Sequence, residues 1–157
     1  MTQLRERSTS ATPPLPDETV LFGREHPEAR LPMILRTIGA IAVLVVGAVH
    51  LQQYLSGYNS ISVIGSLFIL NFAGATVIGL GLLVRAARLR HFPAPLALAG
   101  IGLSGASFVF LFISEHQPLF GFQEHGYRAA IMIALAAEAI AVVTLAAYLA
   151  ARRRRRA

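Results

Sequence analysis

The chain has 157 residues, of which 55% are hydrophobic and only 14% are charged, and its mean hydropathy is +0.59. Soluble domains carry about 25% charged residues, so this composition indicates a membrane protein rather than a soluble one. Cysteine is absent, which excludes disulfides, thiolate metal sites, iron–sulfur clusters and cysteine nucleophiles.

The N-terminal segment 1–30 is expected to be a disordered to weakly ordered tail. Its first part is rich in Ser, Thr and Pro, and such a segment buries too little apolar area to offset the entropy of ordering. Arg5 and Arg7 are followed by STSATPPLPDET, which contains no apolar run. We therefore expect no secretory signal peptide here.

Four apolar segments follow the tail. A transmembrane helix needs about 20 mostly apolar residues to cross roughly 30 Å of hydrocarbon. The segments that meet this requirement lie at about 33–53, 61–84, 95–114 and 128–150. Pro32 opens the first and the pair Pro93 and Pro95 starts the third, as suits a first helical turn. Short connections favour antiparallel neighbours, so residues 31–151 are predicted to form an all-α, antiparallel four-transmembrane-helix bundle.

The distribution of Arg predicts the orientation of this bundle. All 14 basic residues are Arg. All except Arg128 lie before or at the start of the first span, between the second and third spans, or after the fourth. The positive-inside rule makes that side cytoplasmic. Both termini are therefore expected in the cytoplasm, with the connections 54–60 and 115–127 outside the cytoplasmic membrane.

Small residues recur at four-residue spacing within the spans. This spacing lets helix backbones approach closely in lipid. The pairs are Ala75-xxx-Gly79, Gly100-xxx-Ser104, Gly102-xxx-Ala106 and Ala130-xxx-Ala134. They are expected to pack the four helices together, and some can instead meet a partner protein or a second copy of the chain.

A few polar residues lie inside the predicted spans. Asn71 and Glu138 are expected about 15 Å below the outer ends of the second and fourth spans, by helix rise. Ser104 and Ser107 fall near the middle of the third span. A carboxyl group at this depth is costly and marks a functional site by default. Two interpretations remain open: a proton- or cation-binding carboxyl of a small transporter, or a hydrogen-bond network that fixes helix register.

The stretch SEHQPLFGFQEHG, residues 114–126, is nearly mirror-symmetric and rich in metal-competent side chains. A hairpin bent at PLFGF would place the Glu and His of one arm opposite those of the other. Imidazole with carboxylate suits Zn, Cu, Fe or Ni, and two His can hold a haem. The candidates for a transition-metal or haem site are His50, His116, His125, Glu115 and Glu124.

The same side chains also fit a simpler interpretation. Outer helix ends are polar, and Glu124 can pair with Arg128 four residues on. The first outer connection adds further polar groups close by. The candidates for an outer polar patch or substrate vestibule are Gln53, Tyr54, Tyr58 and Arg128.

A polybasic segment, 152–157, ends the chain. Each basic residue next to an anionic inner leaflet contributes about 1 kcal/mol of attraction. The side chains expected to contact lipid headgroups are Arg152, Arg153, Arg154, Arg155 and Arg156. Their position beside the membrane explains them, so we expect no nucleic-acid partner.

With YNSISVIGSLFILNFAGA in the second span and EHQPLFGFQEHG after the third, the chain resembles small four-span integral membrane proteins of high-GC actinobacteria. The resemblance covers the four spans and excludes the tails. No activity is assigned to that group, so the resemblance implies a membrane location and transfers no functional residues.

Three classes of function are compatible with these features. The first is a binding or accessory subunit of a membrane complex, which engages its partner through the outer patch or small-residue faces. The second is a metal- or haem-binding redox protein that uses the outer His residues. The third is a small proton-coupled transporter that uses Glu138. The chain is small and lacks a catalytic motif, so the first class is preferred and an enzyme is not expected.

Overall fold

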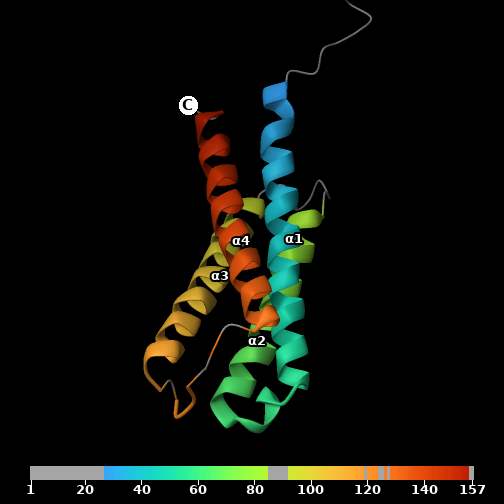
Figure 1. Cartoon of the computed structure of the whole chain (residues 1–157). Helices are drawn as coiled ribbons and strands as arrows, with labels where there is room; N and C mark the ends of the chain where they lie inside the picture. The colour runs from blue at the N-terminus through green and yellow to red at the C-terminus, as the bar shows by residue number, and fades with distance from the viewer. Residues whose placement is uncertain (1–26, 85–91, 119, 124–125, 127, 156–157) are drawn as a thin grey trace, which may run out of the picture.

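The computed structural model describes residues 27–84, 92–118, 120–123, 126 and 128–155. The elements in this part of the chain are all helical (Figure 1). They are α1 (Pro27–Leu55), the short 3-10 helix η2 (Tyr58–Ser60), α2 (Ser62–Leu83), α3 (Pro93–His116) and α4 (Ala129–Arg154). The start of α1 and the end of α4 lie at the same end of the molecule. We call the opposite end, where α1 connects to α2 and α3 to α4, the loop end.

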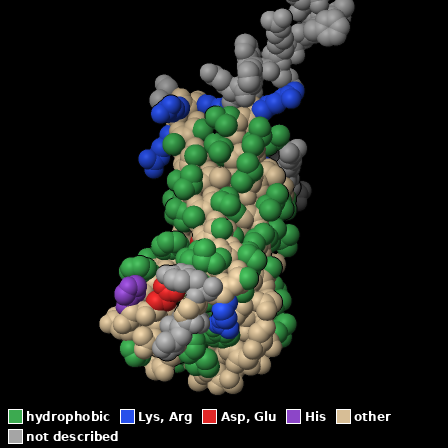
Figure 2. Space-filling view, in the orientation of Figure 1, with side chains coloured by type: hydrophobic (Ala, Val, Ile, Leu, Met, Phe, Trp, Pro, Cys, Tyr) green, Lys and Arg blue, Asp and Glu red, His purple; other side chains and the backbone are tan. Residues whose placement is uncertain are grey.

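Each of the four long helices is long and apolar enough to cross a membrane. Figure 2 shows a broad middle zone dominated by hydrophobic side chains. Basic side chains gather at the end where α1 begins and α4 ends, while charged and polar side chains mix at the loop end. Large apolar residues such as Val77 and Val143 are exposed in this zone, as a lipid-facing surface requires.

The core lies mainly between α1, α2 and α4 and is built around small residues. Ala40 and Val43 of α1, Ala75 of α2, and Ala141 and Leu145 of α4 have no exposed surface. A Cβ added at Gly79 would lie 2.5 Å from Leu44 Cγ, and one at Gly100 would lie 2.8 Å from Leu145 Cδ1. The predicted Ala75-xxx-Gly79 and Gly100-xxx-Ser104 pairs are therefore points of close helix approach.

The third helix is the least covered of the four. It packs mainly on α4, and less closely on α2, and Figure 1 shows its loop-end half leaning away from α2. A Cβ added at Gly102 would meet nothing within 4 Å, so the predicted Gly102-xxx-Ala106 pair begins on an open face. This lean separates α2 from α3 at the loop end.

Three helices extend beyond their predicted bounds. The prediction that Pro32 opens the first helix is wrong, because α1 begins at Pro27 and contains Pro32. Pro32 is the sixth residue of α1, so its missing N–H removes one backbone hydrogen bond from the second turn of the helix. The fourth helix continues to Arg154, since basic residues in a last turn complement the helix dipole.

The predicted outer connection also begins later than expected, because α3 includes Glu115 and His116. In the last turn, the backbone N–H of Gln117 donates a hydrogen bond to the Ile113 carbonyl oxygen, with an N···O distance of 2.9 Å. The chain then turns at Phe120 and Gly121, whose φ angles are 51° and 78°. The first arm of the predicted hairpin is therefore the end of a helix, and its partners Glu124 and His125 lie outside the described residues.

Candidate functional site

A pocket of about 290 Å³ lies at the loop end, where α3 leans away from α2. All four long helices, η2 and Phe122 of the α3–α4 connection line it. Its volume is at the lower end of the range of about 300–1,000 Å³ that is typical of small-molecule sites. Most of its wall is apolar, with Val49, Leu67, Leu103 and Ile131 among the lining residues.

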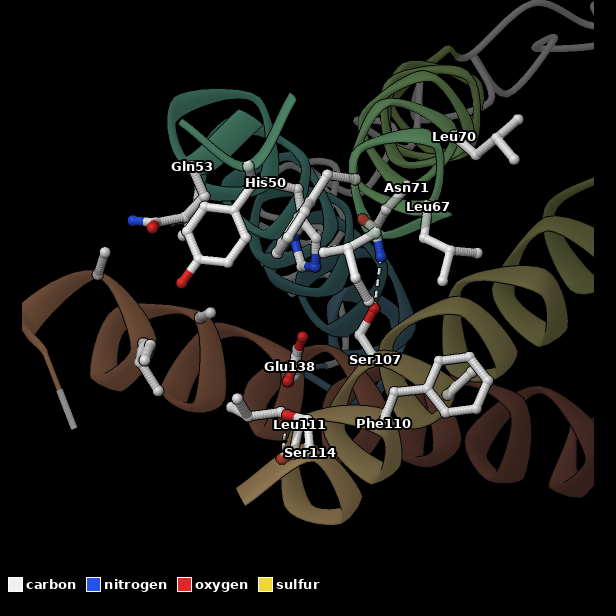
Figure 3. A pocket seen from close by; sticks show the side chains of 18 of the residues that line it. His50, Gln53, Leu67, Leu70, Asn71, Ser107, Phe110, Leu111, Ser114 and Glu138 are labelled. Carbon is white, nitrogen blue, oxygen red and sulfur yellow. Dashed lines mark hydrogen bonds between the residues drawn. The ribbon is translucent and has the colours of Figure 1, made fainter. Parts of the chain in front are cut away.

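Polar side chains from separate helices meet in this pocket (Figure 3). Glu138 points from α4 towards the space that His50 reaches from α1 and Asn71 from α2. The polar residues that line the pocket are His50, Gln53, Tyr58, Asn71, Ser107, Ser114 and Glu138. The structure thus joins members of the predicted outer His cluster, the predicted vestibule and the predicted intramembrane network in one site.

Asn71 and Ser107 link α2 to α3 across the pocket. The Asn71 side-chain amide donates a hydrogen bond to the Ser107 hydroxyl. Asn71 Oδ1 is buried and has no partner among the described residues. This pair therefore leaves one buried hydrogen-bond acceptor unsatisfied within the described part of the chain.

Glu138 is the most buried charged residue of the site, with 2% of its surface exposed. Its Oε2 atom is buried and accepts no hydrogen bond within the described part of the chain. No Arg or Lys is among the described residues that line the pocket. A buried carboxyl group without a basic partner or a hydrogen bond is costly, and the described residues that line the pocket do not supply a partner for Oε2.

His50 is oriented by its own helix. Its Nδ1 lies 2.8 Å from the Val46 carbonyl oxygen, and a carbonyl oxygen only accepts hydrogen bonds. The proton of the neutral ring is therefore on Nδ1, and Nε2 is left as an acceptor. The ring also packs on Phe68, with 5.1 Å between ring centroids.

Aromatic rings close the pocket at the loop end. Tyr58 packs edge-on against Phe68 and Phe122, with ring centroids 4.8 Å and 5.4 Å apart. Arg128 donates a hydrogen bond to the Tyr58 hydroxyl, and its guanidinium carbon lies 5.6 Å from the centroid of the Tyr58 ring. Arg128 is thus beside the pocket and does not line it.

The described residues do not support the predicted metal centre. In this part of the chain, no group of three or more His, Asp or Glu side chains is placed to hold a metal ion. His116 is exposed, with its Nδ1 2.7 Å from the Phe112 carbonyl of its own helix, whereas His50 lines the pocket. The remaining candidates His125 and Glu124 lie outside the described residues.

Other predicted residues lie apart from the pocket. Ser104 is fully buried and its hydroxyl has no partner among the described residues, but it packs away from the pocket lining. Tyr54 is half-buried, and Glu115 lies in the last turn of α3. At the far end of α4, Arg152 Nη1 donates to the Tyr148 hydroxyl at 3.4 Å.

Sequence reasoning missed Ser114 and the apolar lining of the pocket, including the aromatic residues Phe68 and Phe122. Phe68 lies three residues before Asn71, so the shared helix face of residues at this spacing was an available signal. Phe122 belongs to the connection after α3, and only the folded chain shows that its ring reaches Tyr58.

No protein-family model, no curated protein and no solved structure matches this chain.

Proposed function

We propose that this chain is a polytopic protein of the cytoplasmic membrane that binds a small molecule in the loop-end pocket. The observation that carries the proposal is the unsatisfied Glu138 carboxyl inside a mostly apolar pocket. Buried polar groups are normally hydrogen-bonded, and an unsatisfied one that faces a cavity is a position for a ligand. A purely structural role would instead join Glu138 to a partner on another helix.

In the arrangement we propose, the four helices cross the membrane in alternating directions with both termini in the cytoplasm. The gathering of Arg at the end of the molecule where α1 begins and α4 ends supports this orientation. The pocket then opens near the outer face of the membrane. The helical last turn of Arg152, Arg153 and Arg154 is placed to contact anionic lipid headgroups of the inner leaflet.

Filling the pocket is expected to abolish ligand binding. Ala106 lines the pocket from α3 and is exposed, so Ala106→Phe adds a ring to the cavity without crowding the core. Protein in lipid nanodiscs would be denatured and the released organic molecules identified by mass spectrometry. The wild type is expected to release one species in near-stoichiometric amount, and Ala106→Phe at least tenfold less.

Ala99→Phe is the matched control, because Ala99 is exposed on the same helix and does not line the pocket. This variant is expected to release the same species as the wild type. If the wild type, both variants and protein-free nanodiscs release the same molecules in the same amounts, the pocket does not retain a ligand and the proposal is contradicted.

A second candidate is an accessory subunit of a membrane complex. The observation that favours this role is an open face of α3, where a Cβ added at Gly102 or Gly105 would meet nothing within 4 Å. Close helix approach in lipid uses such positions. Co-purification of a partner in mild detergent, lost on Gly105→Leu, would support this role, and a partner-free monomer would contradict it.

A further inference from the structure

Among the described residues that line the pocket there is one carboxyl group and no Arg or Lys. Glu138 lines it from α4, and the other titratable groups that line it are His50 of α1 and Tyr58 of η2. Arg128 contacts Tyr58 from beside the pocket. Burial without a basic partner favours the neutral form of the Glu138 carboxyl group. A cationic ligand would stabilise its ionised form by pairing with it, whereas an anionic ligand would oppose ionisation.

The free polar atoms of the pocket are mostly acceptors. Asn71 Oδ1 is buried and unpartnered among the described residues. The Nδ1–H of His50 donates a hydrogen bond to the Val46 carbonyl, which leaves Nε2 as an acceptor when the ring is neutral. With Glu138 Oε2, these atoms come from three helices and suit a ligand that donates several N–H hydrogen bonds.

The aromatic rings of the pocket favour the same kind of ligand. Tyr58, Phe68 and Phe122 all line it, and their edge-on contacts join them in one cluster. The negative face of an aromatic ring attracts a cation within about 6 Å. The Arg128 guanidinium already occupies such a position at the Tyr58 ring, so this contribution to ligand binding falls to the rings of Phe68 and Phe122.

The side opening of the pocket indicates that the rest of the ligand is apolar. Leu70 and Phe110 line the pocket from α2 and α3, yet 64% and 43% of their surfaces are exposed. Figure 3 shows both side chains at the gap between α2 and α3, on the side of the pocket away from His50 and Glu138. In the proposed membrane arrangement this gap faces lipid acyl chains, so a molecule that uses it must be soluble in lipid.

We infer that the loop-end pocket takes a lipophilic amine in its ammonium form. The ammonium group pairs with the Glu138 carboxylate and donates hydrogen bonds to Asn71 Oδ1 and His50 Nε2. The apolar body extends through the gap between Leu70 and Phe110. This inference rests on the proposed ligand-binding function and adds the charge, the donor pattern and the access route of the ligand.

Three probes of one shape and different charge test the inference: phenylbutylamine, phenylbutanol and phenylbutanoate. Their binding to wild-type protein in nanodiscs of neutral lipid would be measured by equilibrium dialysis against protein-free nanodiscs. The amine is expected to bind at least tenfold more tightly than the alcohol, and the carboxylate to bind most weakly. Glu138→Gln is expected to reduce amine affinity at least tenfold and to leave alcohol affinity within twofold.

The outcomes separate this inference from the proposed function. If the alcohol or the carboxylate binds wild-type protein as tightly as the amine does, the pocket binds small molecules but the ammonium assignment is overturned. If none of the three binds above protein-free nanodiscs, the inference fails and the proposed function loses its support as well. The wild-type ratios decide the matter even if Glu138→Gln fails to fold, and gel filtration and circular dichroism report its folding.

Discussion

Replacing Gly79 with Leu is expected to lower the free energy of unfolding by about 3 kcal/mol, because the new side chain overpacks the contact between α1 and α2. A Cβ at this position would lie 2.5 Å from Leu44 Cγ and 3.2 Å from the Ala40 carbonyl oxygen. The Ala40 carbonyl belongs to the backbone of α1 and cannot move aside without distorting that helix. Thermal unfolding in nanodiscs measures the loss.

Gly102→Leu is the matched control, since a Cβ there meets nothing within 4 Å. Leu is a better helix former than Gly by up to about 1 kcal/mol, so this variant is expected to be as stable as the wild type or slightly more stable. Equal destabilisation by both substitutions would mean that Gly79 is not a point of close helix contact.

The second large effect is expected when single cysteines are introduced at the two ends of the molecule: a membrane-impermeant reagent should label one of them in intact cells and not the other. The chain has no cysteine, so a single introduced cysteine is the only thiol. A membrane-impermeant maleimide is expected to label Ser56→Cys, at the loop end, in intact cells. Arg155→Cys, just after α4, is expected to react only after lysis, because the Arg-rich end is cytoplasmic in the proposed orientation.

The unsubstituted chain gives the background for this measurement, and a permeant maleimide shows that each thiol is accessible once inside the cell. Both Ser56 and Arg155 are exposed, so burial does not protect either position. Labelling of Arg155→Cys and protection of Ser56→Cys in intact cells would reverse the proposed orientation. Labelling of both would mean that the chain does not alternate across the membrane as proposed.

Most of the helical architecture was predictable because it depends on length and hydropathy. Four apolar segments each long enough to span a bilayer were visible in the sequence, and the structure has a helix at each. The helix ends were less predictable. Pro32, Glu115 and His116 all belong to helices. Pro32 lies near the start of α1, where its missing N–H removes one backbone hydrogen bond, and the His116 ring bonds to the Phe112 carbonyl of its own helix.

The site was predictable in its parts but not in its assembly. Asn71 and Glu138 were expected at one depth, and both line the pocket. The sequence contains no signal for the rotation of one helix about its axis relative to another. The sequence therefore did not show that His50 and Glu138 line the same pocket. It also did not show that His116 lies on the surface, with its ring hydrogen-bonded to the Phe112 carbonyl of its own helix. The lean of α3, which opens the pocket, depends equally on tertiary packing.

The most direct test of the central claim is photo-crosslinking with a diazirine derivative of phenylbutylamine, followed by peptide mapping of the labelled protein in nanodiscs. We expect adducts on the segments 67–71 of α2 and 110–114 of α3, which border the side opening of the pocket. Excess phenylbutylamine should suppress these adducts and excess phenylbutanoate should not. Adducts spread evenly over the lipid-facing surfaces of the four helices, unaffected by either competitor, would contradict a ligand pocket centred on Glu138.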